Sequence, residues 1–214
     1  MSELYTQIRE VRAQVSKAIN AELTDADILR FLRARNLDLQ ATLKMIVDWH
    51  AWRHAPICET STLTPATVLS RENFKDAKEP LYASLMPHSN VARDKAGRPI
   101  YFEKTGLISN RMDDILKKFT TDELVIRHVR QQELMMKRIE DASSITGTTI
   151  EKQVIVFDLK SLSFSLNIAV LGIFQRCISI RLPIVQGCFY LYVCACTKSM
   201  HNSFCLTITM HNFL

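Results

Sequence analysis

Three arginines near the start of the chain are the side chains best suited to binding an anion. Arg30, Arg33 and Arg35 lie within one predicted helix, where their guanidinium groups could pair with a carboxylate or a phosphate. At this spacing the side chains leave a helix on different sides, so all three cannot face one partner. Two interpretations stay open: salt bridges to a second part of the protein, and phosphate binding.

The histidines alone do not indicate a metal centre. Of the six, His50 and His54 are spaced at i and i+4, which lets two imidazoles on one helix face share a ligand. The sequence supplies no third ligand and no glutamate base between them, so a surface or interhelix role is favoured.

Other catalytic patterns are also missing from the sequence. The chain has no Gly-x-Ser-x-Gly motif of a nucleophilic serine. The acidic pairs Asp113-Asp114 and Asp122-Glu123 suit the positive ends of helices better than a catalytic carboxylate pair. The five glycines stand at least nine positions apart, unlike the clustered glycines of common phosphate-binding loops. We therefore expect a protein that is not an enzyme, uses no cofactor or metal and binds no nucleotide.

The charge of the chain is mild, with 27 basic and 22 acidic side chains and a net charge of +5. It lacks the concentrated basic stripe of nucleic-acid-binding proteins, but it suits transient contact with anionic membrane surfaces. The polar start, MSELYTQIRE, has no apolar signal-peptide core, so we expect a cytoplasmic protein, peripheral to membranes.

The six cysteines crowd toward the end of the chain. In a reducing compartment we expect them to be small buried side chains rather than disulfides. A zinc site can be imagined from Cys194, Cys196, His201 and Cys205. It is disfavoured because one residue between the first two cysteines departs from the usual ligand spacing.

Residues 1–75 are predicted to form a small helical lobe. An apolar stripe predicts a first helix, and its members are Leu4, Ile8, Val11, Val15 and Ile19. Two further helices are expected to begin after the capping residues Thr24 and Asp38, and a short one at Thr64-Pro65. Residues 76–97 show little periodicity and are expected to be a connector.

Beyond the connector the sequence alternates between strands and helices. A strand is predicted over 100–104, and Thr120 and Glu123 form a capping box for a long helix that ends near Ile139. The uninterrupted apolar run 154–157 is typical of a strand covered on both faces, as in a parallel sheet. A helix over 167–180 and a buried strand over 188–193 complete the pattern. The fold class is therefore α/β, with a sheet behind the helical lobe.

Three motifs, in this order, resemble the CRAL-TRIO lipid-binding family. The segment 28–38, ILRFLRARNLD, with Trp49 and Trp52-Arg53, is similar to the helical entry lobe of that family. The segment 94–103, DKAGRPIYFE, resembles its first sheet strand, and 156–160, VFDLK, its central strand. The resemblance covers residues 1 to about 181. It is strongest toward the phosphatidylinositol/phosphatidylcholine transfer proteins of the secretory pathway.

The resemblance implies a helical lobe packed on a mixed, mostly parallel sheet with flanking helices, whose floor forms an apolar pocket for one lipid. By that likeness Arg35 matches an arginine linked to phosphoinositide headgroups, and Tyr101 a pocket tyrosine. Gln153, Ile155 and Phe157 share one face of the central strand, the face that would line the pocket. Hydroxyl residues stand at the positions of Gln153 and Ile155 in phosphatidylcholine-binding members, so the resemblance does not imply selectivity for choline lipids.

The likeness weakens after about Ile180 and stops after Val193. Leu182-Pro183-Ile184 replaces a Tyr-Pro-Glu segment of the family, and neither the gate helix nor its lysine has a counterpart. We expect a partial CRAL-TRIO lipid-binding domain over 98–193 and a divergent tail over 194–214. Such an ending is typical of an altered reading frame or an alternative transcript.

Two functions are consistent with these patterns. The first is a monomeric, non-enzymatic carrier that binds a phospholipid, phosphatidylinositol or a related lipid, and transfers it between membranes. The second is a regulatory or interaction fragment that contacts a membrane or a partner protein and carries no lipid.

Overall fold

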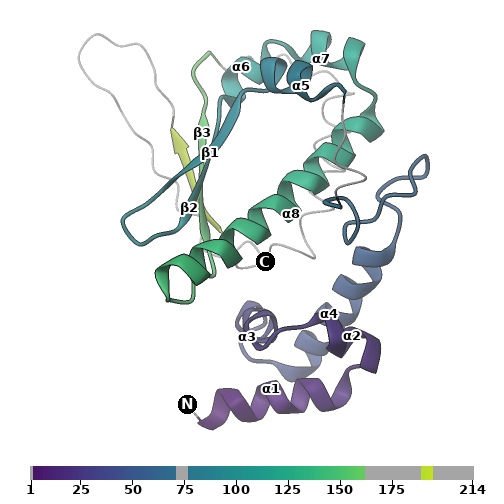
Figure 1. Ribbon diagram of the computed structural model, residues 1–214, viewed down its shortest axis with the longest axis vertical. Helices are drawn as coiled ribbons and strands as arrows, with labels where there is room; N and C mark the ends of the chain where they lie inside the picture. The colour runs from purple at the N-terminus through teal and green to yellow at the C-terminus, as the bar shows by residue number, and fades with distance from the viewer. Residues whose placement is uncertain (1, 71–76, 162–188, 195–214) are drawn as a thin grey trace.

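We describe residues 2–70, 77–161 and 189–194 of a computed structural model of the chain (Figure 1). A lobe of helices α1–α4 lies beside a four-stranded sheet, and the long helix α8 runs between them. Helices α5–α7 lie together near one end of α8. Within these residues no helix is both long and apolar enough to cross a bilayer.

The helical lobe contains α1 (Ser2–Gln14), α2 (Lys17–Glu22), α3 (Asp25–Ala34) and α4 (Leu39–His54). The apolar stripe that predicts one first helix is divided between α1 and α2, so that prediction is wrong. The break occurs because Ser16 caps α2: its hydroxyl oxygen accepts a hydrogen bond from the Ile19 amide at 3.3 Å.

The predicted caps of the next two helices are confirmed. Thr24 accepts from the amide of Asp27, whose carboxylate accepts in return from the Thr24 amide, which makes a capping box. The Asp38 carboxylate accepts from the Ala41 amide at 2.9 Å. The short helix expected at Thr64-Pro65 is instead a hydrogen-bonded turn over 65–69.

One apolar core holds the lobe together. Every helix of the lobe contributes to it, and Phe31 and Trp49 meet edge to face with ring centroids 5.7 Å apart. Its buried members are Ile8, Val11, Ile19, Leu23, Ile28, Phe31, Leu32, Met45, Ile46 and Trp49.

The expected connector holds two elements, α5 (Glu79–Leu85) and β1 (His88–Arg93). Pro80 occupies the first turn of α5, where the missing amide hydrogen costs no helical bond. A tight turn joins β1 to β2, because the Asp94 carboxylate accepts from the Ala96 and Arg98 amides. Gly97 supplies the left-handed conformation in this turn, with φ +80°.

The sheet has the order β1-β2-β3-β4, with β2 (Pro99–Glu103), β3 (Gln153–Asp158) and β4 (Phe189–Cys194). The edge strand β1 is antiparallel to β2, whereas β2, β3 and β4 are parallel. The mixed sheet and its flanking helices confirm the predicted fold class. The helix expected over 167–180 lies outside the described residues, and so does the tail expected over 194–214 except for Cys194, which ends β4.

Three helices lead from β2 back to β3: α6 (Thr105–Ser109), α7 (Met112–Lys118) and α8 (Thr121–Thr146). The capping box of Thr120 and Glu123 begins α8 as predicted, and the helix ends seven residues later than expected. A second apolar core joins α5–α8, with Ile108, Ile115, Phe119 and Leu124 buried. This core fixes one end of α8, so that the rest of the helix can cross the sheet.

Candidate functional site

The predicted pocket face of the sheet is buried against α8. Parallel pairing places Tyr101 of β2 opposite Ile155 of β3. Tyr101 and Ile155 pack with Met135 of α8, all nearly inaccessible, and Phe157 packs half-buried against them. We name Tyr101, Met135, Ile155 and Phe157 the sheet-face cluster. Three of the five predicted site residues therefore meet in one apolar group.

A short polar chain extends from this cluster along β2. The Tyr101 hydroxyl donates to Glu103 Oε2 at 2.6 Å, and the Thr105 hydroxyl donates to Glu103 Oε1 at 2.9 Å. The imidazole of His88 on β1 lies near the tyrosine, with ring centroids 5.9 Å apart. The polar end of Tyr101 is thus held at the edge of an otherwise apolar surface.

Gln153 begins the same face of β3 and is a buried polar residue, 1% exposed. Its amide nitrogen Nε2 donates to the Met135 sulfur at 3.1 Å, a weak acceptor. On α8, three positions before Met135, Gln132 is 2% exposed, and its Oε1 has no hydrogen-bond partner among the described residues. Buried amide groups of this kind retain the capacity to bond a polar group.

Arg138 lies one turn further along α8. Its Nη1 is buried without a hydrogen-bond partner in the described chain. Burial lowers the pKa of the Arg138 guanidinium, and Asp141 opposes that shift. An arginine stays charged in proteins, so α8 carries a partly desolvated cation three positions after Met135.

The three arginines of α3 separate, as their spacing predicts. Arg30 pairs with Asp27 on its own helix at 3.0 Å. Arg33 reaches across to Glu151, just before β3, and this confirms a salt bridge between the lobe and the second part of the chain. Arg35 follows the last residue of α3 as its C-cap. Its side chain is half-buried and forms no hydrogen bond or ion pair with the described residues. Arg35 does not join the sheet-face cluster.

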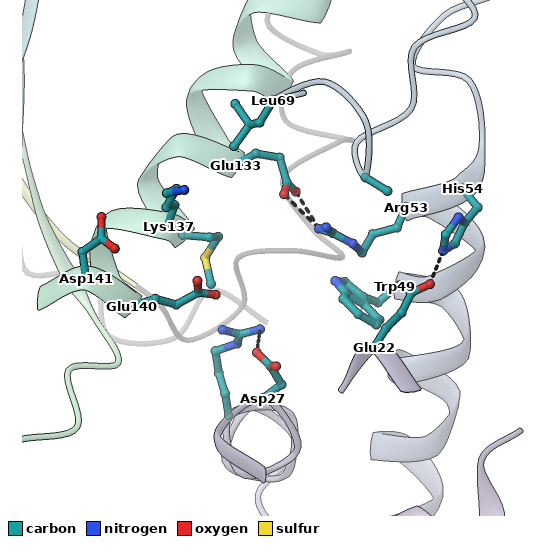
Figure 2. A pocket seen from close by; sticks show the side chains of 13 residues that line it. Glu22, Asp27, Trp49, Arg53, His54, Leu69, Glu133, Lys137, Glu140 and Asp141 are labelled. Atoms are coloured by element: carbon teal, nitrogen blue, oxygen red, sulfur yellow. Dashed lines mark hydrogen bonds and ion pairs between the residues drawn. The ribbon is translucent and has the colours of Figure 1, made fainter. Parts of the chain in front are cut away.

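A cavity of about 600 Å³ lies between α8 and the helical lobe (Figure 2). Its wall mixes both charges with a few apolar side chains: Glu22, Asp27, Arg30, Trp49, Arg53, His54, Ala66, Leu69, Glu133, Met136, Lys137, Glu140 and Asp141. None of the predicted site residues lines it. This cavity is therefore distinct from the sheet face.

An ion pair that the sequence analysis did not identify crosses this cavity. Arg53 Nη1 donates to both carboxylate oxygens of Glu133 at 2.9 Å, and its guanidinium lies 5.4 Å from the Trp49 ring (Figure 2). Burial raises the pKa of Glu133, while the charge of Arg53 opposes the rise. The sequence contains a pattern that could have predicted this pair. Glu133 continues the four-residue spacing of the buried Val125 and Val129, and a carboxylate buried on that face requires a partner.

Comparisons with known proteins agree with this arrangement. Residues 90–186 match the model of the CRAL/TRIO domain. A CRAL-TRIO domain-containing protein of Saccharomyces cerevisiae is 32% identical over 168 residues, which cover 76% of this chain and 51% of that protein. The SEC14 cytosolic factor of Candida glabrata is 28% identical over 190 residues, covering 86% of this chain and 59% of that protein.

A third relative is the Arabidopsis thaliana phosphatidylinositol/phosphatidylcholine transfer protein SFH12, 33% identical over 106 residues, covering 50% of this chain and 18% of that protein. The crystal structure of Sfh5 superposes with a TM-score of 0.60 at 13% identity, covering 86% of this chain and 57% of that one, and it supports the fold. The chain spans 51% and 59% of the length of the two yeast relatives. It contains a CRAL/TRIO domain, and the family resemblance that its motifs indicate is thereby confirmed.

Proposed function

We propose that this chain binds one phospholipid against the β2–β3 face and transfers it between membranes without chemical change. The observation that carries the proposal is the sheet-face cluster, an apolar wall built by two parallel strands and α8. Relatives named as phosphatidylinositol/phosphatidylcholine transfer proteins support phosphatidylinositol or a related lipid as the ligand. Relatives named as cytosolic factors support a cytoplasmic protein, peripheral to membranes.

The apolar wall offsets the cost of removing the lipid from the bilayer. Exposing an acyl chain of ordinary length to water costs roughly 10 kcal/mol, at about 0.8 kcal/mol for each methylene, and burial against the wall avoids this cost. We expect the half-buried Phe157 to contact acyl carbons first, and the more deeply buried Tyr101 and Ile155 to form the wall beside it. No covalent step is needed, because the lipid only changes its surroundings.

Polar groups of β3 and α8 are suited to a headgroup. Gln153 and Gln132 are buried amides with bonding capacity left, and Arg138 is a partly desolvated cation. Arg35 is proposed to contact the phosphorylated headgroup of phosphatidylinositol, as the family resemblance implies. Its unpaired guanidinium within the described chain supports that role.

A pair of variants on one strand tests the wall. Phe157→Asp places a charge on the proposed lipid face, while Val156→Asp places the same charge on the opposite face of β3 at a similarly half-buried position. After incubation with vesicles that contain labelled phosphatidylinositol, we expect Phe157→Asp to retain at least tenfold less lipid than Val156→Asp. Circular dichroism checks that both variants are folded. Equal retention by the two variants would refute the assignment of this face.

A second pair tests the headgroup residue. Arg35→Gln removes a charge with no described partner, and Arg33→Gln removes one that pairs with Glu151. We expect Arg35→Gln to reduce transfer of phosphatidylinositol several-fold and to change transfer of phosphatidylcholine little. An equal loss for both lipids, or the same lipid-selective loss in Arg33→Gln, would contradict the role of Arg35.

The alternative function is an interaction fragment that carries no lipid. The observation in its favour is the partial coverage of the yeast relatives, 51% and 59% of their length. Absence of lipid from the purified chain, together with absence of transfer between vesicles, would favour the fragment over the carrier.

A further inference from the structure

Three potential metal ligands meet where α2 ends against α4. His50 and His54 lie one turn apart on α4, and Glu22 is the last residue of α2. Their ligand atoms all lie within 4.8 Å of one another, the single group of this kind within residues 2–70, 77–161 and 189–194. We propose that Glu22, His50 and His54 form a site for a divalent transition-metal ion of the zinc class.

The distances fit one ion with little movement. His54 Nε2 lies 2.8 Å and His50 Nε2 lies 3.7 Å from Glu22 Oε1 (the first of these contacts is drawn in Figure 2). Tetrahedral ligands at about 2.0–2.1 Å from zinc lie roughly 3.3 Å from one another. The two observed separations bracket this value, so rotation of the side chains alone can bring the three atoms around one ion.

The donor set selects the class of ion. Two imidazole nitrogens and one carboxylate oxygen suit Zn²⁺, Cu²⁺ or Ni²⁺, whereas Ca²⁺ and Mg²⁺ prefer oxygen ligands throughout. His50, Glu22 and His54 are 24%, 36% and 46% exposed, so water can complete the coordination. Three protein ligands and one open position are the arrangement of zinc sites that exchange a ligand.

The backbone that carries the ligands is held in place by the core of the lobe. Ile19 of α2 and the neighbouring Met45, Ile46 and Trp49 of α4 are all buried in that core. A site between two packed helices costs little conformational entropy when the ion binds.

The charges around the site also permit a cation. Arg53 is adjacent to His54 in the chain, but its guanidinium is bonded to both oxygens of Glu133. The ion pair directs this positive charge toward α8 and neutralises it. Glu22 contributes the negative charge that partly offsets the charge of the ion.

A bound ion would link α2 to α4 and stabilise the folded lobe, because the unfolded chain does not hold the three ligands together. At a zinc concentration about one hundred times the dissociation constant, we expect the unfolding temperature to rise by about 5 °C or more. We expect the chain without metal also to unfold cooperatively, because the lobe folds without the ion and the ion only adds to its stability.

The experiment is a titration of the whole chain with Zn²⁺ alone, read by calorimetry and by thermal unfolding. We expect His50→Ala, His54→Ala and Glu22→Gln each to weaken zinc binding at least tenfold and to abolish the rise in unfolding temperature. Asp48→Asn removes an exposed carboxylate of α4 outside the cluster and should change neither. Circular dichroism without metal checks that every variant is folded.

The cysteine-rich end of the chain offers a rival zinc site, and a further variant separates the two. His201→Ala should leave zinc affinity unchanged, and Co²⁺ bound to the chain should lack the intense near-ultraviolet absorption of thiolate ligands. Zinc binding that survives His54→Ala and Glu22→Gln, or that is lost in His201→Ala, would overturn the proposal. Absence of binding at micromolar zinc would overturn it as well.

Discussion

At the scale of single residues, the pair of Arg53 and Glu133 shows how burial controls charge in this protein. Glu133 is 8% exposed, and burial raises its pKa above the usual range of a glutamate, against the opposing effect of Arg53. A carboxyl group with a raised pKa holds its proton more tightly in the folded state. Its contribution to stability therefore falls as the pH rises through the interval between the unfolded and folded pKa values.

Removal of Arg53 should make the stability of the protein depend more strongly on pH. Arg53→Ala leaves a buried carboxylate without its partner, and we expect the free energy of unfolding to fall by about 3 kcal/mol near pH 8. Without Arg53 the pKa of Glu133 rises further, so the deficit should shrink as the pH falls toward 5 and the carboxyl group is protonated. Urea unfolding at several pH values measures this difference in the free energy of unfolding. The double variant Arg53→Ala/Glu133→Gln is the control, and its stability should depend only weakly on pH because it has no carboxyl group at position 133. A deficit independent of pH would contradict the assignment.

At the scale of elements, local chemistry decides where the helices begin. The caps at Thr24, Asp38 and Thr120 could be predicted from the sequence. At each of them a side-chain oxygen accepts a hydrogen bond from the free backbone amide three residues later, in the first turn of the helix. The break between α1 and α2 was missed because the apolar stripe continues through it, and only Ser16 marks it. Strand β1 was missed because an edge strand needs only one covered face and shows weak periodicity.

In the site, too, the features set by neighbouring residues could be predicted from the sequence, whereas contacts between distant elements could not. The two-residue period of β3 correctly places Gln153, Ile155 and Phe157 on one face. Partners that come from remote elements could not be read from the sequence. Glu133 meets Arg53, and Glu22 meets His50 and His54, only because the helical lobe packs beside α8 and α2 packs on α4.

The contribution of a helix cap to stability can be tested at the start of α8. The Thr120 hydroxyl accepts from the Glu123 amide. The Glu123 carboxylate accepts from Lys78 and from the Thr120 amide, and these two hydrogen bonds lower the pKa of the carboxyl group. Thr120→Ala should lower the free energy of unfolding by about 1 kcal/mol. Thr121→Ala, one residue inside the helix, is the matched control and should change stability little. Equal effects of the two variants in urea unfolding would show that the cap is unimportant.

The approach of α6 to the end of β3 depends on a glycine. A Cβ at Gly106 would lie 2.2 Å from the Lys160 carbonyl oxygen and 2.8 Å from the Leu159 backbone. Because backbone atoms cannot move aside cheaply, we expect Gly106→Ala to cost about 3 kcal/mol. Gly147→Ala meets no atom within 4 Å but keeps φ at +64°, so it should cost only about 1 kcal/mol. Thermal unfolding of both variants gives the order, and a reversed order would contradict the close approach.

At the scale of the whole molecule, the helical lobe and the sheet are joined through polar contacts. Arg53 with Glu133 and Arg33 with Glu151 connect α4 and α3 to the second part of the chain, and Thr60 donates a hydrogen bond to Asp122 at the start of α8. The apolar cores lie within each part instead. The sheet-face cluster, which we propose as the wall of the lipid site, thus belongs entirely to the second part of the chain.

Native mass spectrometry of the purified chain, with extraction and identification of any bound lipid, tests the proposed function most directly. We predict one phospholipid per chain after exposure to vesicles that contain phosphatidylinositol, retained by Val156→Asp and lost in Phe157→Asp. A folded chain that repeatedly carries no lipid, and that moves none between vesicles, would contradict the carrier function.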